Sequence, residues 1–166
     1  YDQTVFDSNN ALYINGSQAS WDGLKWVKMF GSSSVSKLVF NVTSIVDNRY
    51  GLTAYKVDVD ELPYVIFDKI VFTLSVADDR INVGSSAQIN VSGVYAYDGS
   101  SFQGYARLND TEFAKAGVGK YGFTVMAVSD SLYGLTVFDS NAVSVVWDGL
   151  SVYSQAVDLE GGTVCV

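Results

Sequence analysis

The side chains able to carry out catalysis are few in this chain. The sequence contains no histidine, which removes the usual general base, the Ser-His-Asp and Cys-His arrangements and the commonest ligand for zinc. The single cysteine, Cys165, lies in an apolar run and is interpreted as a small hydrophobic side chain. The sequence therefore argues against an enzyme.

Carboxylates are the remaining reactive groups. A pair of them would suit glycoside hydrolysis, but most aspartates lie in turn-forming segments, where hydrogen bonds to the backbone account for them. Clustered carboxylates could also bind calcium, which prefers oxygen ligands. The residues for this are Asp58 and Asp60, followed by Glu61, and the pair Asp78 and Asp79. No cofactor is required by the sequence, and calcium is left open.

Two further groups of residues could carry or bind sugar. Four Asn-x-Ser/Thr triplets predict N-glycan acceptors at Asn15, Asn41, Asn90 and Asn109. Asn15 and Asn109 are favoured because each follows a predicted strand, whereas the other two lie within strands. Trp21, Trp26 and Tyr13 could stack against a carbohydrate, but packing in a core or at a domain junction is favoured for them.

Charge and length exclude several classes of partner. A net charge of −8 and a pI near 4.2 disfavour nucleic acid and anionic membrane surfaces, since phosphate binding needs clustered Lys and Arg. No stretch approaches the ~20 apolar residues of a membrane span. The 166 residues can bury a core without metal or disulfides. Because Tyr1 opens directly into strand-like sequence, a secreted form is expected to have lost its signal peptide.

An internal repeat organises the chain. Residues 35–53 match residues 118–136 without a gap, and residues 65–70 match residues 145–150. Residues 12–15 likewise match residues 106–109. One complete repeat therefore runs from about Asp68 to Trp147.

The complete repeat has the pattern of a sheet protein. Short runs rich in Val, Tyr, Phe and Thr alternate with turn-forming pairs such as Asp98-Gly99. Strands at this spacing predict an all-β fold made of immunoglobulin-like β-sandwich domains, with no helix. The expected strands are 70–76, 87–97, 103–108, 119–127, 134–138 and 143–147.

The two ends of the chain are in complementary register. Residues 1–6 match residues 97–102, in the middle of the complete repeat, so the first unit lacks its leading strands. Residues 150–158 resemble residues 70–78, which form the start of that repeat. The predicted domains are an incomplete acceptor sandwich (1–66), a complete sandwich (67–148) and a donor-strand tail (149–166).

We expect the tail to complete the first domain of a neighbouring subunit. It leaves the second unit without spare residues to return along a sandwich ~40 Å long, and strand addition satisfies an open sheet edge. Each fully buried aliphatic side chain contributes ~1.5 to 3 kcal/mol. Such head-to-tail contacts generate an open homopolymer unless the rotation between subunits closes a ring. The expected donor residues are Leu150, Val152, Val157, Leu159, Val164 and Val166.

The repeat resembles the tandem immunoglobulin-like repeats of large archaeal cell-surface and S-layer-like proteins. The resemblance is carried by residues 76–84, by Tyr133-Gly134-Leu135-Thr136 and by Val146-Trp147-Asp148. It covers nearly the whole chain and departs at residues 58–63, an insertion, and at residues 158–163, where the tail is shorter. It implies an extracellular, glycosylated structural protein.

Together these patterns predict a structural subunit of an extracellular filament, tube or sheath on a microbial, archaeal cell surface. Its partner would be a second copy of itself, joined head to tail. Two alternatives stay open, a fragment of a larger repeat protein and a glycan-binding or adhesive module.

Overall fold

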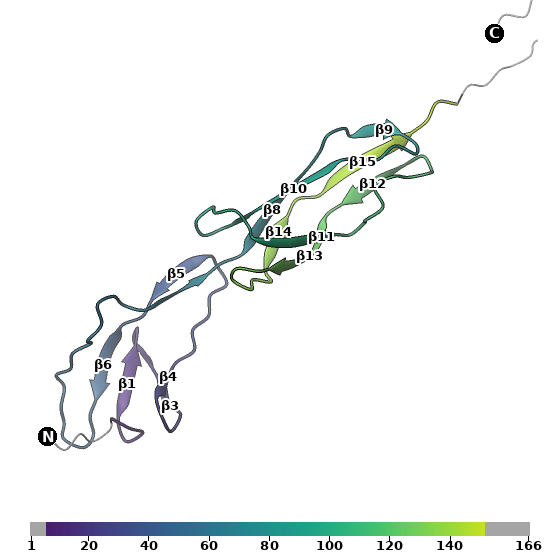
Figure 1. Cartoon of the computed structure of the whole chain (residues 1–166). Coiled ribbons are helices and arrows are strands. Elements are labelled where there is room, and N and C mark those ends of the chain that lie inside the picture. The colour runs from purple at the N-terminus through teal and green to yellow at the C-terminus, as the bar shows by residue number, and fades with distance from the viewer. Residues whose placement is uncertain (1–5, 152–166) are drawn as a thin grey trace, which may run out of the picture. The chain divides into compact units, whose positions relative to one another are not determined.

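The computed structural model describes residues 6–151, which are all-β and contain no helix. No helix that could cross a membrane is therefore present among them. Contacts divide the chain into two units (Figure 1). Unit 1 contains the residues up to Lys69 together with Tyr95–Ser100, and unit 2 contains Ile70–Val94 and the residues from Ser101 onward.

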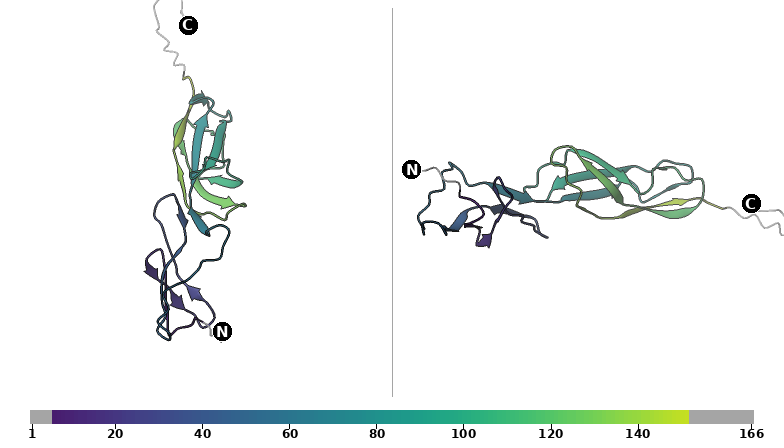
Figure 2. Two further views of the ribbon diagram at one scale, coloured as in Figure 1. Left: turned by 90° about the vertical axis from the view of Figure 1, so that its left-hand side faces the viewer. Right: turned by 90° about the horizontal axis from the view of Figure 1, so that it is seen from below.

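Unit 2 is built from three small sheets, and Figure 2 shows its strands from two further sides. Their orders are β10-β8-β14, β12-β15-β9 and β11-β13. The strands are β8 (Ile70–Val76), β9 (Arg80–Asn82), β10 (Ile89–Tyr95), β11 (Gly104–Leu108), β12 (Gly119–Phe123), β13 (Val125–Asp130), β14 (Phe138–Ser140) and β15 (Val143–Asp148).

The core of unit 2 follows the two-residue period of its strands. Side chains alternate between the faces of a strand, and β8 accordingly buries Ile70, Phe72 and Leu74 while β15 buries Val145 and Trp147. The β8 and β15 strands contact each other. This sandwich-like packing leaves the intervening residues of β8 more exposed.

Aromatic side chains complete this core. The ring of Tyr121 meets the Trp147 ring edge-on at 5.4 Å between centroids. Phe72 contacts Phe102 and Phe138 in the same T-shaped manner. The Trp147 indole N–H donates to the Ser85 carbonyl at 2.8 Å, so its polar atom is satisfied although the residue is buried.

The segment 119–127, expected as one strand, forms parts of two sheets. It pairs with β15 as β12 and with β11 as β13. The break falls at Thr124, whose backbone N–H donates to the Asn109 side chain at 2.9 Å. The short parallel strand β9 was not predicted, and β14 begins where the strand expected at 134–138 ends.

Unit 1 also contains three small sheets, β2-β1-β6, β3-β4 and β5-β7. Its strands are β1 (Ala11–Ile14), β2 (Ser17–Gln18), β3 (Ser20–Trp21), β4 (Trp26–Val27), β5 (Ser36–Val39), β6 (Val42–Val46) and β7 (Tyr64–Phe67). Two of these pairings repeat those of unit 2.

The sequence repeat is also a repeat of strand register. Ile14 faces Val42 in the β1–β6 pair as Leu108 faces Val125 in the β11–β13 pair, and both pairs have an irregularity just before that position. Ser36 faces Phe67 in the β5–β7 pair as Gly119 faces Trp147 in the β12–β15 pair. These residues are equivalent in the sequence alignment, so β1, β5, β6 and β7 correspond to β11, β12, β13 and β15.

Unit 1 differs from unit 2 in the strands that residues 6–69 lack. Strands β8, β9 and β10 have no counterpart there, so β7 pairs with β5 alone whereas β15 lies between β12 and β9. Ala19 is the one buried hydrophobic residue in this described stretch. Unit 1 therefore repeats the paired strands of unit 2 without the strands that cover them.

Candidate functional site

The strand pair β5 and β7 in unit 1 is the first candidate site, and we call it the uncovered pair. Its central cross-strand contact joins Leu38 and Val65, which are equivalent to Tyr121 and Val145 in unit 2. Val65 has an exposed fraction of 38%, whereas that of Val145 is 0%. An apolar strand with this exposure and an unpaired edge is suited to pairing with a further strand.

Both faces of β7 are accessible in the described chain. Tyr64, Val65 and Ile66 are successive residues that point alternately to opposite faces, and all three are exposed. The Lys37 ammonium lies 3.7 Å from the centre of the Tyr64 ring, a cation-π contact on the outer face. The opposite face of β7 carries Val65, whose cross-strand partner is Leu38. We call this apolar face the inner face.

The chain leaves β7 and β15 with the same local hydrogen bond. The Asp68 carboxylate accepts the backbone N–H of Lys69 at 2.8 Å, and the Asp148 carboxylate accepts that of Gly149 at 2.8 Å. After Lys69 the chain enters β8, whose first residue, Ile70, is buried. The equivalent residue after Gly149 is Leu150, which is fully exposed. The other predicted donor residues, Val152, Val157, Leu159, Val164 and Val166, lie outside the described residues.

The predicted glycan acceptors fall into two structural groups. The side-chain amides of Asn15 and Asn109 each join two backbone segments: Asn15 donates to Val39 O at 2.8 Å, and Asn109 donates to Gly122 O at 3.0 Å. Asn41 and Asn90 are exposed, and the Asn90 side chain accepts a bond from Gln88. The nitrogen that would carry a sugar is therefore engaged with the backbone at the two favoured positions.

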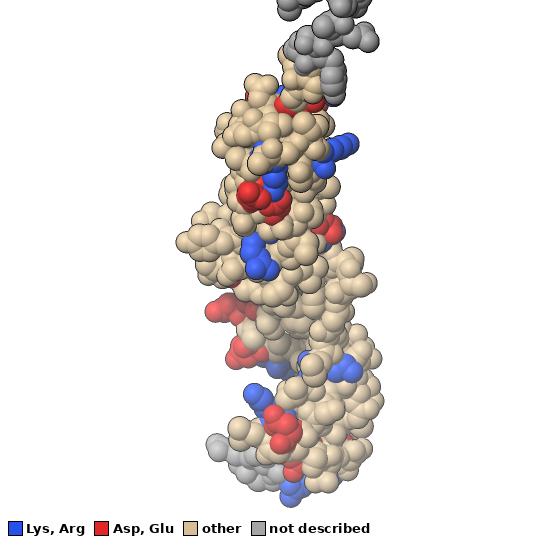
Figure 3. Space-filling model, turned by 90° about the vertical axis from the view of Figure 1, so that its right-hand side faces the viewer, with Lys and Arg blue, Asp and Glu red and all other residues tan. Residues whose placement is uncertain are grey.

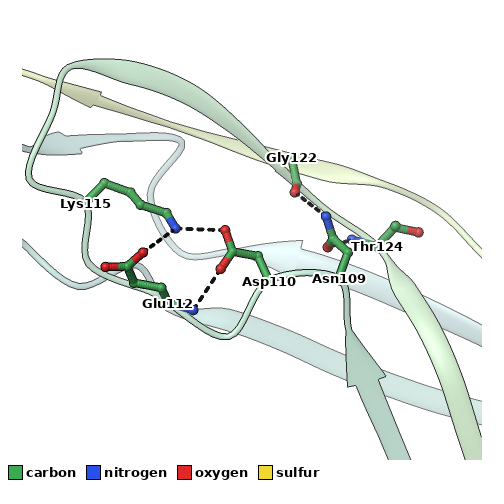
Figure 4. A network of polar contacts seen from close by, with 6 residues as sticks. All are labelled: Asn109, Asp110, Glu112, Lys115, Gly122 and Thr124. Carbon is green, nitrogen blue, oxygen red and sulfur yellow. Dashed lines mark hydrogen bonds and ion pairs between the residues drawn. The ribbon is translucent and has the colours of Figure 1, made fainter.

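An ion cluster centred on a buried lysine lies in the loop between β11 and β12 (Figure 4). The Lys115 side chain is 9% exposed, and its ammonium contacts Asp110 at 2.8 Å and Glu112 at 3.2 Å. The hydrogen bond from Lys115 lowers the pKa of Asp110, helped by the Glu112 backbone N–H. The bond to Asp110 in turn raises the pKa of Lys115. The ion pairs of Lys115 with Asp110 and Glu112 therefore hold this loop together. This cluster was not predicted from the sequence.

The residues proposed for calcium are dispersed. Asp58 is paired with Lys56 at 3.1 Å on the surface, and Asp60, Asp78 and Asp79 are exposed. Within residues 6–151, no three carboxylate, cysteine or histidine side chains come together as a metal site. Calcium stays a prediction. Basic and acidic side chains are scattered over the face shown in Figure 3, where most of the surface is uncharged.

The two tryptophans considered for sugar stacking lie together on the β3–β4 hairpin. Trp21 and Trp26 are directly opposite each other, with ring centroids 5.6 Å apart and an interplanar angle of 60°. They line a cavity of about 440 Å³. Tyr13 is not among its lining residues.

No protein-family model matches the chain, and comparison with curated proteins and with solved structures gives no match either.

Proposed function

We propose that this chain is a structural subunit of an extracellular homopolymer, in which the tail of one copy completes unit 1 of the next by donating β-strand. In this proposal both units are immunoglobulin-like sandwiches and the protein is not an enzyme. The absence of histidine from the sequence agrees with a passive role.

The contrast between Leu150 and Ile70 is the observation that carries the proposal. These residues occupy the same repeat position, two residues after an Asp that accepts the next backbone N–H, yet Ile70 is buried in its own unit and Leu150 is fully exposed. A fully exposed leucine at a core position of the repeat indicates a side chain whose partner is another unit.

The uncovered pair supplies the matching acceptor. In unit 2, β8 packs against β15 and pairs with β14. In unit 1 the equivalent of β15 is β7, and residues 52–58, which correspond to residues 135–141 and so include the equivalent of β14, contain no strand. A strand with the sequence of residues 150–158 would meet both surfaces in the register that β8 uses.

The occupant we propose is residues 150–166 of a second copy. The strand after β7 belongs to unit 2 and not to unit 1, so by repetition the strand after β15 belongs to a following unit. The register of residues 164–166, which match 94–96, runs on into that of residues 1–6, which match 97–102. The resemblance to archaeal surface repeats supports an extracellular, glycosylated setting.

A directed disulfide tests this pairing. In the β14–β8 pair, Phe138 faces Ile70; the equivalent residues are Tyr55 in unit 1 and Leu150 after β15. In a Cys165→Ser background, Tyr55→Cys and Leu150→Cys are placed in separate chains that are produced together. Neighbouring strands lie about 4.8 Å apart, which suits a disulfide, so we expect a covalent dimer on non-reducing gels.

The controls separate the alternatives. Tyr105, exposed on β11 of unit 2, should give no dimer when Tyr105→Cys replaces Tyr55→Cys. A disulfide that forms only within a chain carrying both cysteines would mean that the tail closes its own unit 1, and failure to form any disulfide would refute strand donation. A natural product much heavier than 18.0 kDa would favour a fragment of a longer repeat protein.

A further inference from the structure

The β3–β4 hairpin is an addition to unit 1 that the repeat does not require. It lies between Asn15 and Ser36, whose equivalents in unit 2, Asn109 and Gly119, are joined by a shorter loop without strands. Trp21 lies on β3 and Trp26 lies on β4, and Figure 1 labels both strands. The shared architecture therefore does not account for the two tryptophans.

Core packing does not account for Trp21 either. Trp147 is fully buried and belongs to the unit 2 core, whereas Trp21 and Trp26 are only half-buried. Trp26 is fixed in place because its indole N–H donates to the Phe6 carbonyl at 2.9 Å and its ring contacts the Phe6 ring at 5.6 Å. Trp21 packs against this anchored ring and also lines the cavity.

The cavity has a mixed aromatic and neutral polar lining. Its volume is about 440 Å³, within the range of about 300 to 1,000 Å³ typical of small-molecule sites. Among the residues that the structure describes, the lining contains no charged side chain. Beside Ala19 and the two tryptophans, it is formed by Ser8, Asn10, Gln18 and Ser20.

We propose that this cavity binds a neutral pyranose, as a free sugar or as part of an oligosaccharide. A pyranose ring presents C–H groups on one face, which suit the electron-rich face of an indole, and hydroxyls on its edge, which suit amide and hydroxyl side chains. The uncharged lining and the net charge of −8 disfavour anionic sugars. This site is independent of the uncovered pair.

Saturation-transfer NMR and tryptophan fluorescence on the full chain test this site. The probes are glucose, galactose, mannose and N-acetylglucosamine with their β-linked disaccharides, and glucuronic acid is the anionic comparison. We expect at least one neutral sugar to bind and glucuronic acid to bind more weakly. Trp21→Ala should weaken binding about tenfold or more, because it removes one stacking face.

Matched variants distinguish a binding role from a folding role. Gln18→Ala removes a polar group that lines the cavity and should also weaken binding, whereas Tyr105→Ala removes an exposed aromatic from unit 2 and should leave it unchanged. Unfolding curves identify any variant that fails to fold. No binding of any neutral sugar at millimolar concentration, or equal binding by wild type, Trp21→Ala and Gln18→Ala, would overturn the proposal. Neither result depends on strand donation, which the disulfide experiment measures separately.

Discussion

At the scale of single residues, the side chains of Asn15 and Asn109 make the pair of hydrogen bonds that backbone groups make elsewhere in a sheet. Each accepts a backbone N–H from the break between two strands, Asn41 at 3.0 Å and Thr124 at 2.9 Å, and each donates to a carbonyl two residues earlier in that segment. The equivalent bonds in both units show that the arrangement belongs to the repeat. These bonds lie where the chain passes from β5 to β6 and from β12 to β13, which belong to different sheets.

Replacing Asn109 should therefore weaken unit 2. Asn109→Ala removes both hydrogen bonds and should lower the free energy of unfolding by about 1 to 3 kcal/mol. Asn109→Asp keeps the acceptor for Thr124 but loses the donor to Gly122, so its effect should be smaller at neutral pH. Chemical denaturation of the two variants measures this order, and equal stability of Asn109→Ala and wild type would contradict it.

The same contacts bear on glycosylation. Attachment of a sugar to the amide nitrogen of Asn15 or Asn109 would compete with its bond to the backbone. The side chains of Asn41 and Asn90 are exposed, and within the described chain neither amide donates to a backbone carbonyl. Sequence alone favours Asn15 and Asn109 because an Asn-x-Ser/Thr triplet after a strand has the same pattern whether its asparagine carries a glycan or holds the fold. Only the register across the strands distinguishes them.

At the scale of elements, the β11–β12 loop depends on its ion cluster. The Lys115 hydrogen bond holds the pKa of Asp110 below the ordinary 3.8, so this pairing stabilises the fold fully above pH 3.8 and is lost as pH falls through the lowered pKa. The pKa of Lys115 is raised above 10.5 by the bond to Asp110. Its contribution is therefore present below pH 10.5 and is lost as pH rises through the raised pKa.

Lys115→Met removes this dependence. We expect the pKa of Asp110 to move back toward 3.8 in an NMR titration and the denaturation midpoint of unit 2 to vary less with pH at both extremes. Lys120→Met, which removes an exposed lysine from β12, is the matched control and should leave the Asp110 pKa unchanged. An unaltered Asp110 titration in Lys115→Met would show that the lysine does not set it.

Individual strands were predictable to different degrees. The strand at Ile70–Val76 was predicted with its observed bounds, because its residues alternate between buried and exposed positions and its ends carry turn signals. The division at Thr124 was not, since it is set by Asn109, a residue distant in sequence. The β9 strand is only three residues long and pairs in parallel with β15, so no local pattern marks it.

The candidate sites were predictable in part as well. The exposure of β7 agrees with the repeat register, which indicated that strands are missing from the first unit. The proximity of Trp21 and Trp26 could be considered from their aromatic type, but the hairpin that joins them depends on Asp22, whose carboxylate accepts the backbone N–H groups of Leu24 and Lys25. The polar lining contributed by Ser8 and Gln18 comes from other segments and has no sequence signal.

At the scale of the whole molecule, the two units should differ in stability. Among the described residues, unit 1 buries two hydrophobic side chains, Ala19 and Tyr95, whereas unit 2 buries seven, and burial of apolar surface dominates the free energy of folding. We expect two unfolding transitions. The first should be reported by Trp21 and Trp26 and the second by Trp147.

Removing residues 150–166 should shift only the first of these transitions. If unit 1 is completed by the tail of another copy, the truncated chain loses that stabilisation, while unit 2 keeps its own core. Fluorescence-detected denaturation of a Trp147→Phe chain reports unit 1, and a chain with Trp21→Phe and Trp26→Phe reports unit 2. A truncation that leaves the unit 1 midpoint unchanged would contradict strand donation.

The parallel pairings of unit 2 have a mechanical consequence. Ile70, where the chain enters the unit, is opposite Phe138 in the β14–β8 pair, and Asp148, where the chain leaves β15, is opposite Asn82 of β9. Tension that draws Ile70 and Asp148 apart along the strand direction loads these ladders in shear, so their hydrogen bonds must rupture together and not in succession. Such a unit resists the separation of its two ends far better than it resists the peeling of one strand from its neighbour. A subunit that transmits tension between two neighbours would need this property.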